Sequence, residues 1–307
     1  METISGQPVS RFSFGTMQFG AKADKAASAA MFTACREAGI NFFDSAYVYT
    51  GGISEEILGG LIADAREDVF IATKFGDKKT ATADVLHREF AESRRRLGQE
   101  TVDLLYVHQP DLVTPIEETL AAVAEYVHAG AVRYVGISNF SAWSTMKARQ
   151  VARDLGIDVT FLQPMYNLVK RQAEVEILPM AISEGFYVCP YSPLGGGLLT
   201  GKYAEGQGGR LKDDNMYTVR YGVDWMYQTA TDLAALGSEI GVSPATLAVA
   251  WVARHPGVWG PIISARSMEQ LQPSLDAMGL EMDDALYARL SALSPTPPPA
   301  NDRLEEA

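Results

Sequence analysis

The chain has 307 residues, of which 47% are apolar and 21% charged, a composition typical of a globular protein with a sizeable core. Its formal net charge of −12 argues against a nucleic acid as a partner, because a protein that neutralises many phosphates needs a basic face. The chain has two cysteines and no Cys-x-x-Cys pair, so the sequence predicts neither a disulfide framework nor a metal site.

The N-terminal segment, residues 1–10, is polar and lacks the apolar centre of a signal peptide. No run of about 18 apolar residues occurs in the sequence, so we expect neither a transmembrane helix nor a membrane partner. The expected location is the reducing cytoplasm.

One pattern recurs along the chain: an amphipathic helix ends, a glycine follows, and a short apolar run comes next. Glycine suits the left-handed position at the end of a helix. Repeats of such a unit at roughly 25–35 residues are typical of alternating β and α structure. The glycines that precede apolar runs are Gly39, Gly98, Gly130, Gly156, Gly185 and Gly257.

Eight apolar runs are predicted to be strands, and several are almost continuously apolar, as parallel strands buried on both faces require. The predicted fold class is therefore α/β, a (β/α)8 TIM barrel that forms a single domain over residues 1–307. A doubly wound open sheet is the alternative, but no G-x-G-x-x-G turn follows any strand. The predicted strands are residues 12–17, 40–44, 69–74, 102–108, 132–137, 159–163, 186–191 and 258–263.

The segments between these strands have the apolar spacing of helices. Leu86, Phe90 and Leu97 lie on one helical face. Pro115 suits the first turn of the next helix, and Ser141 can cap the one after that.

The regular spacing breaks after the seventh strand. A long polar stretch, residues 201–225, follows it, and we expect this loop to be a mobile cover over the barrel mouth. Two helices are predicted after it, over residues 227–240 and 244–254. Residues 294–307 are Pro-rich and charged, and we expect them to form a loose tail.

The predicted strands end on polar residues, which core packing alone does not require. In a parallel barrel these strand ends face the active site. Lys74 ends an apolar strand, and a buried lysine needs a counter-charge, for which Asp44 is the natural partner. A purely structural ion pair is the alternative interpretation.

Tyr49 lies five residues beyond Asp44. A nearby ammonium is expected to lower the pKa of this tyrosine and make it a general acid. His108, at the end of the fourth strand, is expected to hydrogen-bond a substrate oxygen from the other side.

A set of motifs then matches a known family in order and spacing. They are Phe43-Asp44-Ser45-Ala46 with Tyr49, Ile71-Ala72-Thr73-Lys74, Asp103-Leu104-Leu105-Tyr106 with His108, Gly136-Ile137-Ser138-Asn139-Phe140, Gln163 with Tyr166-Asn167, and Tyr191-Ser192-Pro193-Leu194 running to Gly201-Lys202-Tyr203. With these motifs the sequence resembles the aldo-keto reductase family over nearly its whole length.

The resemblance implies NADPH-dependent interconversion of a small-molecule carbonyl and an alcohol. Four residues would form the catalytic tetrad: Tyr49 as proton donor, Lys74 tuning it, Asp44 paired to Lys74, and His108 orienting the carbonyl. Hydride would come from C4 of the nicotinamide, whose ring would lie on Tyr191.

The resemblance also implies a set of cofactor contacts. Ser138, Asn139 and Gln163 would hold the carboxamide, whose donor and acceptor they match. The other residues expected to contact the cofactor are Gly15, Thr16, Met17, Asp44, Tyr191, Ser192, Leu194, Gly196, Lys202, Arg210, Ser264, Arg266, Ser267, Gln270 and Ser274.

Arg266 and Ser267 occupy the family's position for the phosphate on the adenosine ribose, so NADP(H) is favoured over NAD(H). Two residues depart from the family pattern. Ser264 stands where relatives often carry Gly, and Ser274 stands where an Asn usually meets the adenine.

Two other functions stay open at this point. One is a Schiff-base aldolase that uses Lys74 as its nucleophile. The other is a cofactor-binding regulatory subunit, as relatives attached to membrane channels are. The sequence leaves the substrate and the oligomeric state open. The aromatic residues Tyr47, Trp143, Tyr217, Tyr221 and Trp225 form either a substrate wall or loop packing.

Overall fold

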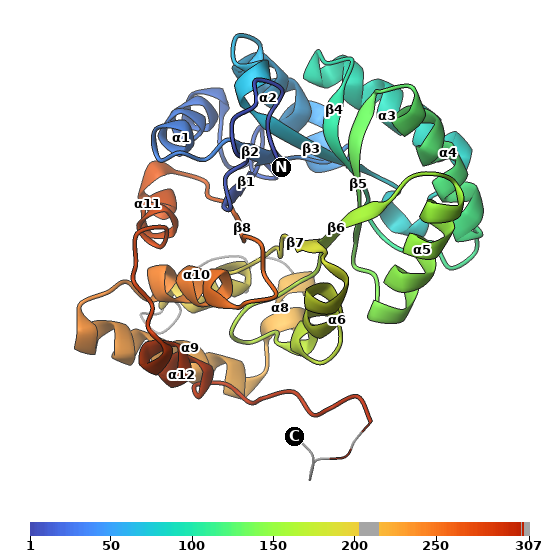
Figure 1. The fold of residues 1–307 in the computed structure, drawn as a ribbon. Helices are drawn as coiled ribbons and strands as arrows, with labels where there is room; N and C mark the ends of the chain where they lie inside the picture. Colours follow the sequence, from blue (N-terminus) through green and yellow to red (C-terminus); the bar gives the residue numbers. More distant parts are fainter. Residues whose placement is uncertain (203–214, 302, 304–307) are drawn as a thin grey trace.

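The fold is an eight-stranded parallel sheet wrapped by helices, as seen in the computed structural model, which describes residues 1–202, 215–301 and 303 (Figure 1). Neighbouring strands follow the order β7-β6-β5-β4-β3-β2-β1-β8, and each pairing is parallel. The strands are β1 Ser13–Gly15, β2 Phe42–Asp44, β3 Phe70–Phe75, β4 Val102–Val107, β5 Val132–Ser138, β6 Val159–Gln163, β7 Tyr187–Val188 and β8 Ile262–Ile263.

Backbone hydrogen bonds beyond β7 and β8 join the two ends of the sheet. Ile262 N donates to Pro190 O at 2.9 Å, and Trp259 N donates to Val188 O at 2.9 Å. These bonds complete the ring, and the predicted (β/α)8 barrel is confirmed.

Strands β7 and β8 have only two residues each, far fewer than the predicted runs at residues 186–191 and 258–263. Proline explains the difference, because it has no N–H to donate to a neighbouring strand. Pro190 lies just after β7 and Pro261 just before β8.

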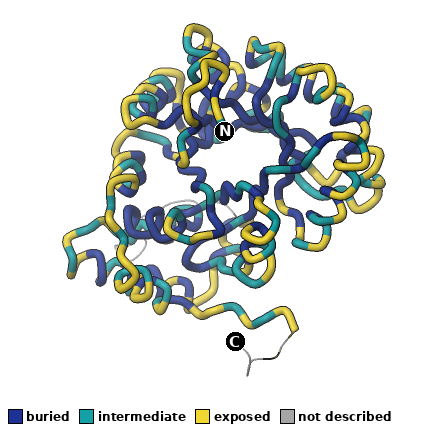
Figure 2. Tube along the Cα trace, viewed as in Figure 1, coloured by how far each residue is buried: buried dark blue, intermediate teal, exposed yellow. Residues whose placement is uncertain are grey.

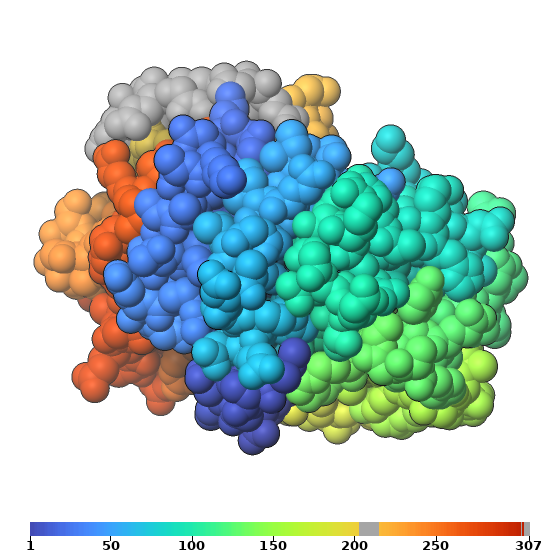
Figure 3. Space-filling view, turned by 90° about the horizontal axis from the view of Figure 1, so that it is seen from above, coloured from blue at the N-terminus to red at the C-terminus, as the bar shows by residue number. Residues whose placement is uncertain are grey.

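Helices surround the sheet, and in Figure 3 α1 to α4 lie side by side as adjoining surfaces, from blue to green. Their bounds are α1 Lys25–Glu37, α2 Ile53–Ile62, α3 Ala83–Leu97, α4 Ile116–His128, α5 Ala142–Asp154, α6 Ile177–Glu184, α8 Asn215–Tyr221, α9 Asp224–Ile240, α10 Pro244–Arg254, α11 Met268–Asp276 and α12 Asp284–Ser291. Short segments of 3-10 helix are η1 Tyr49–Gly52, η2 Arg66–Asp68, η3 Asp77–Lys79, η4 Gln172–Glu174 and η5 Gly195–Thr200.

Most of the predicted helix boundaries are correct. Ser141 caps α5 by accepting a hydrogen bond from Ser144 N at 3.2 Å. Gly185 closes α6 with a left-handed φ of 73°. Pro115 lies one position before α4, at its cap, and not in its first turn. Gly257 lacks a positive φ, so its predicted role as a helix terminator is wrong.

The segment after β7 is more ordered than predicted. Residues 215–221 form α8, with Tyr217 and Tyr221 buried, so the expectation of a structureless loop is wrong for that part. Residues 203–214 lie outside the described part of the chain, as does the predicted role of Arg210. The start of the predicted tail is held in place, since Arg171 donates to Ser294 O at 3.3 Å.

The core has two layers, one inside the barrel and one between the strands and the helices, and burial in Figure 2 follows the strands. Aromatic rings fill the inside, with Phe42 and Phe70 at 4.8 Å between centroids. Gly136 is required here, because a Cβ on it would lie 2.4 Å from the ring of Tyr106. Side chains therefore fill the interior of the barrel as a packed core.

In the described part of the chain, no single helix has the length and hydropathy to cross a membrane. Only α9 and α10 taken together pass that test, and they are bent by 101° where they meet.

A buried carboxylate ties three strands together. Asp103 in β4 is fully buried and accepts a hydrogen bond from Ile71 N of β3 at 2.9 Å. Arg66 and Arg133 lie 2.9 and 2.6 Å from its two oxygens. Removal of one partner from such a group leaves charges without compensation.

We predict that Asp103→Asn lowers the free energy of unfolding by about 3 kcal/mol, because two partly buried arginines lose their counter-charge. Urea unfolding measures this change. The control is Glu239→Gln, which breaks an exposed pair with Arg289 at 2.9 Å and should cost less than about 1 kcal/mol. Equal effects of the two variants would contradict the role of Asp103.

Candidate functional site

The polar residues at the carboxyl ends of β2, β3 and β4 meet at one end of the barrel. Asp44 is the last residue of β2, Lys74 is in β3, and His108 directly follows β4. Tyr49 begins η1, in the loop after β2. Parallel strands present their carboxyl ends on one side, so the fold brings these four side chains together.

Lys74 is the centre of this cluster and is 1% exposed. Its ammonium forms an ion pair with Asp44 and donates to Ser45 O at 2.6 Å and to Tyr49 Oη at 3.5 Å. Burial alone would lower the pKa of Lys74, but the charge of Asp44, assisted by Tyr49, outweighs it and leaves the pKa raised. The expected ion pair is present, and it keeps the amine protonated.

Asp44 is held from two sides. One carboxylate oxygen meets Lys74, and the other accepts a hydrogen bond from Gln163 Nε2 at 2.9 Å. Burial raises the pKa of Asp44, and these two donors oppose that rise. Gln163 comes from β6, so the carboxylate links distant parts of the barrel.

Tyr49 does not have the lowered pKa that the sequence suggested. Burial raises its pKa, and the ammonium of Lys74 only partly offsets this because Asp44 acts in the opposite direction. The hydroxyl of Tyr49 is therefore protonated at neutral pH. A protonated hydroxyl next to an ammonium is able to donate a proton and then be stabilised as a phenolate.

His108 faces Tyr49 across the site, with the two rings 6.1 Å apart and 81° from parallel. Burial lowers the pKa of His108 to about 3, and the charge of Lys74 acts in the same direction. The imidazole is therefore neutral and can still donate one hydrogen bond. Tyr49 and His108 thus offer two donors to a single acceptor.

The residues expected at the carboxamide form a chain of hydrogen bonds. Tyr191 Oη donates to Asn139 Oδ1 at 2.7 Å, and Asn139 Nδ2 donates to Ser138 Oγ and His108 O, both at 3.0 Å. Ser138 Oγ donates to Gln163 O at 2.9 Å. Asn139 has a φ of 65°, a strained backbone found often at functional sites. The network joins the expected nicotinamide platform to the catalytic cluster.

Ser192, Leu194 and Gly196, which the resemblance places along the pyrophosphate of the cofactor, line the turn after β7. Ser192 has a φ of 58°, and its carbonyl accepts a hydrogen bond from Asn167 at 2.8 Å. Leu194 precedes η5. A Cβ on Gly196 would lie 2.6 Å from the ring of Tyr217 in α8, and Lys202 Nζ lies 3.3 Å from the Cβ position of Gly197.

The remaining expected contacts lie on both sides of the barrel mouth. Gly15 ends β1, and Met17 follows Thr16, which is buried and donates to Asp44 O at 3.2 Å. Thr16 Oγ1 also lies 2.8 Å from Ser54 Oγ. The role of Ser54 and Ser45 in holding this corner was not predicted. The signal for Ser45 was the buried lysine, which needs more than one acceptor.

Beyond β8, the expected residues surround the start of α11. Ser267 caps this helix by accepting a hydrogen bond from Gln270 N at 3.4 Å. Arg266 is half-buried just before it, and Ser264 is exposed. Ser274 is 1% exposed, and its buried hydroxyl has no hydrogen-bond partner among the described residues.

The side chains fit a nicotinamide dinucleotide. A flat ring, Tyr191, lies beside amide and hydroxyl groups at the catalytic end. A cation, Arg266, and a helix N-terminus lie at the other end, as a phosphate requires.

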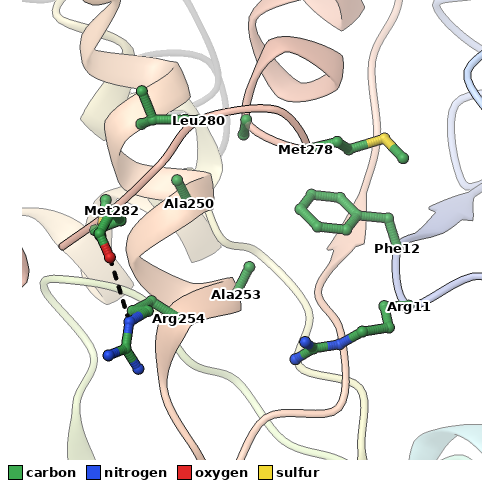
Figure 4. Close-up of a pocket in the computed structure, with 9 residues that line it drawn as sticks. Arg11, Phe12, Ala250, Ala253, Arg254, Met278, Leu280 and Met282 are labelled. Atoms are coloured by element: carbon green, nitrogen blue, oxygen red, sulfur yellow. Dashed lines mark hydrogen bonds between the residues drawn. The ribbon is translucent and has the colours of Figure 1, made fainter.

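A pocket of about 340 Å³ lies away from this cluster (Figure 4). It is lined by Arg11, Phe12, Ala250, Ala253, Arg254, Ala277, Met278, Leu280 and Met282. Phe12 precedes β1, so the pocket opens at the amino ends of the strands, opposite the catalytic cluster. It contains none of the predicted site residues.

Comparison with known proteins gives a family match over most of the chain. A model described as Aldo/keto reductase family matches residues 11–295. A probable voltage-gated potassium channel subunit beta from Oryza sativa subsp. japonica is 36% identical over 291 residues, covering 89% of each chain. Aflatoxin B1 aldehyde reductase member 2 from Rattus norvegicus is 34% identical over 299 residues, covering 89% of this chain and 82% of the relative. An uncharacterized oxidoreductase of Bacillus subtilis, YrpG, is 32% identical over 317 residues, covering 95% of this chain and 94% of the relative.

We predict that the His108 imidazole stays neutral from about pH 8 to about pH 5, since burial and then Lys74 hold its pKa at about 3. Imidazole 15N NMR, assigned with His108→Gln, measures this. The denatured protein is the control and should titrate near about 6.5. A midpoint near that value in the native protein would contradict the prediction.

The lowered pKa of His108 also makes the free energy of unfolding depend on pH. The unfolded chain takes up a proton on His108 near about pH 6.5, whereas the folded chain does so only at about 3. The contribution of His108 to stability is therefore complete above the unfolded pKa and falls as the pH drops through this window.

Proposed function

The chain belongs to the aldo/keto reductase family, and from this premise we propose that it reduces an aldehyde or ketone with NADPH, reversibly. Enzymes of this family act on small-molecule carbonyls with a nicotinamide cofactor. The observation that carries the proposal is the convergence of a protonated Tyr49, a neutral His108 and the Lys74–Asp44 pair at one end of the barrel.

The bound cofactor supplies a hydride from C4 of its nicotinamide. The protein binds and polarises the carbonyl: the hydroxyl of Tyr49 and the imidazole of His108 both donate to its oxygen. As negative charge develops on that oxygen, Tyr49 transfers its proton. The ammonium of Lys74, 3.5 Å from Tyr49 Oη, then stabilises the phenolate.

Asp44 fixes Lys74 without being in reach of the carbonyl. Its second oxygen is held by Gln163, so the pair cannot swing away from Tyr49. In the reverse direction the same phenolate accepts a proton from the alcohol.

The Schiff-base aldolase is disfavoured by the contacts of Lys74. A nucleophilic amine must be neutral, but Asp44 and Tyr49 act to raise the pKa of Lys74 and outweigh burial. The three oxygen atoms around Nζ also leave it little room to attack a carbonyl.

The regulatory role is a second candidate, favoured by the similarity to proteins named channel beta subunits. This candidate implies a protein partner. Steady-state turnover separates the two functions, because a regulatory subunit is expected to bind NADPH tightly and turn over slowly.

NADP(H) is the proposed cofactor because Arg266 precedes the N-terminus of α11 and Ser267 caps it. A ribose phosphate there would gain an arginine, a hydroxyl and a helix N-terminus. The proposed cofactor contacts are otherwise those expected from the sequence, with Ser274 as an exception because its side chain faces the protein interior.

We predict that Tyr49→Phe lowers the rate of carbonyl reduction by about a hundredfold or more, because the ring stays and the proton donor is lost. NADPH affinity should change less than about twofold, which fluorescence titration measures. Turnover near the wild-type rate in this variant would overturn the mechanism.

We predict that Arg266→Ala raises the Michaelis constant for NADPH roughly 10–100-fold and that for NADH much less, since only NADPH loses a charged contact. Parallel steady-state measurements with the two cofactors give the comparison. The exposed Arg289→Ala in α12 is the matched control. Equal effects of Arg266→Ala on both cofactors would remove the case for this phosphate site.

A further inference from the structure

The helix α8 packs on η5 in the segment after β7. Tyr217 and Tyr221, one turn apart in α8, stack with their ring centroids 6.4 Å apart and 25° from parallel. The ring of Tyr217 covers Gly196, and the ring of Tyr221 lies 3.6 Å from the Cβ position of Gly195. A Cβ on Gly196 would lie 2.6 Å from the ring of Tyr217, so the absence of a side chain there lets α8 lie directly on η5.

A cationic side chain lies over the ring of each of these tyrosines. The guanidinium of Arg220 lies 5.4 Å from the ring centroid of Tyr217, and Lys170 Nζ lies 5.8 Å from that of Tyr221. Burial lowers the pKa of Lys170, and the charge of Arg220 lowers it further, so the two cations are close enough to repel each other.

No carboxylate of the described chain compensates these two charges. Neither Arg220 nor Lys170 makes an ion pair within residues 1–202, 215–301 and 303, although the sequence carries a net charge of −12. Other half-buried arginines do have acidic partners, such as Arg171, whose Nε lies 2.9 Å from Glu174. Two neighbouring cations without a counter-charge among the described residues indicate a site for an anion.

Arg220 lies close to Tyr191, the residue expected to support the nicotinamide ring. Burial raises the pKa of Tyr191 to about 12, and the charge of Arg220 acts against that rise, so the guanidinium lies near the expected nicotinamide platform. Tyr217, under Arg220, is near enough to Tyr49 to raise its pKa as well. Asn167 Nδ2 donates both to Tyr221 Oη at 3.3 Å and to Ser192 O at 2.8 Å, so α8 is joined to the residue that follows Tyr191.

We propose, on the basis of the proposed reductase function, that Arg220 and Lys170 select substrates whose carbonyl is accompanied by a carboxylate. The phosphates of the cofactor are the other possible source of an anion. The resemblance assigns the pyrophosphate to Ser192, Leu194 and Gly196 and the ribose phosphate to Arg266 and Ser267, which leaves the two cations for the substrate. Guanidinium also matches the geometry of a carboxylate.

A pair of aldehydes that differ only in charge tests this proposal: 4-formylbenzoate and its methyl ester. The readout is the ratio of kcat/KM for the acid to that for the ester, with NADPH at saturation. Wild type should favour the acid. Arg220→Gln should lower the ratio roughly 10–100-fold, and Lys170→Gln should lower it less.

Two variants serve as controls. Arg220→Lys keeps the charge and should retain part of the selectivity, which a merely structural role would not predict. Arg289→Gln removes an exposed arginine of α12 and should leave the ratio unchanged. An unchanged ratio in Arg220→Gln overturns the proposal. So does weaker NADPH binding at constant ratio, which assigns the cations to the cofactor.

A failure of the proposed reductase function can be distinguished from a failure of the anion-site proposal. If wild type reduces neither aldehyde, calorimetric titration of benzoate into the NADPH-loaded protein tests the anion site separately. Binding to wild type that is lost in Arg220→Gln supports the site. Equal binding, or none, to both proteins overturns it.

Discussion

The buried ion pair between Lys74 and Asp44 is the constraint on which the rest of the site depends. Two charges inside a barrel are costly unless each is surrounded by partners. Here Gln163 holds the carboxylate, and Ser45 O holds the ammonium at 2.6 Å. These partners come from β2, β3 and β6, so the pair requires the whole barrel to close correctly around it.

The same pair sets the protonation states that reduction of a carbonyl needs. Lys74 stays charged beside Asp44, while burial and then the charge of Lys74 keep His108 neutral. Burial raises the pKa of Tyr49 and so keeps its hydroxyl protonated. The neighbouring ammonium of Lys74 can stabilise the phenolate once the proton has left. One ammonium thus favours the product of proton transfer and excludes a second positive charge from the site. This arrangement does not determine which carbonyl is accepted; in our proposal that choice depends on Arg220 of α8 and on Lys170.

The sequence predicted the barrel and the meeting of Asp44, Lys74 and His108 because both follow from local patterns, the helix–glycine–strand repeat and the polar strand ends. What it missed depends on three-dimensional surroundings. The direction of the pKa shift of Tyr49 reflects burial, which no neighbour in sequence reveals. The burial of Ser274 depends on how α11 packs. The polar composition of residues 201–225 predicts a loop where the structure has α8. The helix can form because Gly196 has no side chain, which lets Tyr217 pack against its backbone.

The most direct test of this account is single-turnover hydride transfer from NADPH to an aldehyde in Lys74→Met, with NADPH affinity measured in parallel. Methionine keeps most of the length of the lysine side chain and removes its charge. The account predicts a rate at least about a hundredfold below wild type, because the phenolate of Tyr49 loses its stabilising ammonium, with NADPH affinity changed less than about threefold. A rate of hydride transfer within about threefold of wild type would contradict the central role of the ion pair.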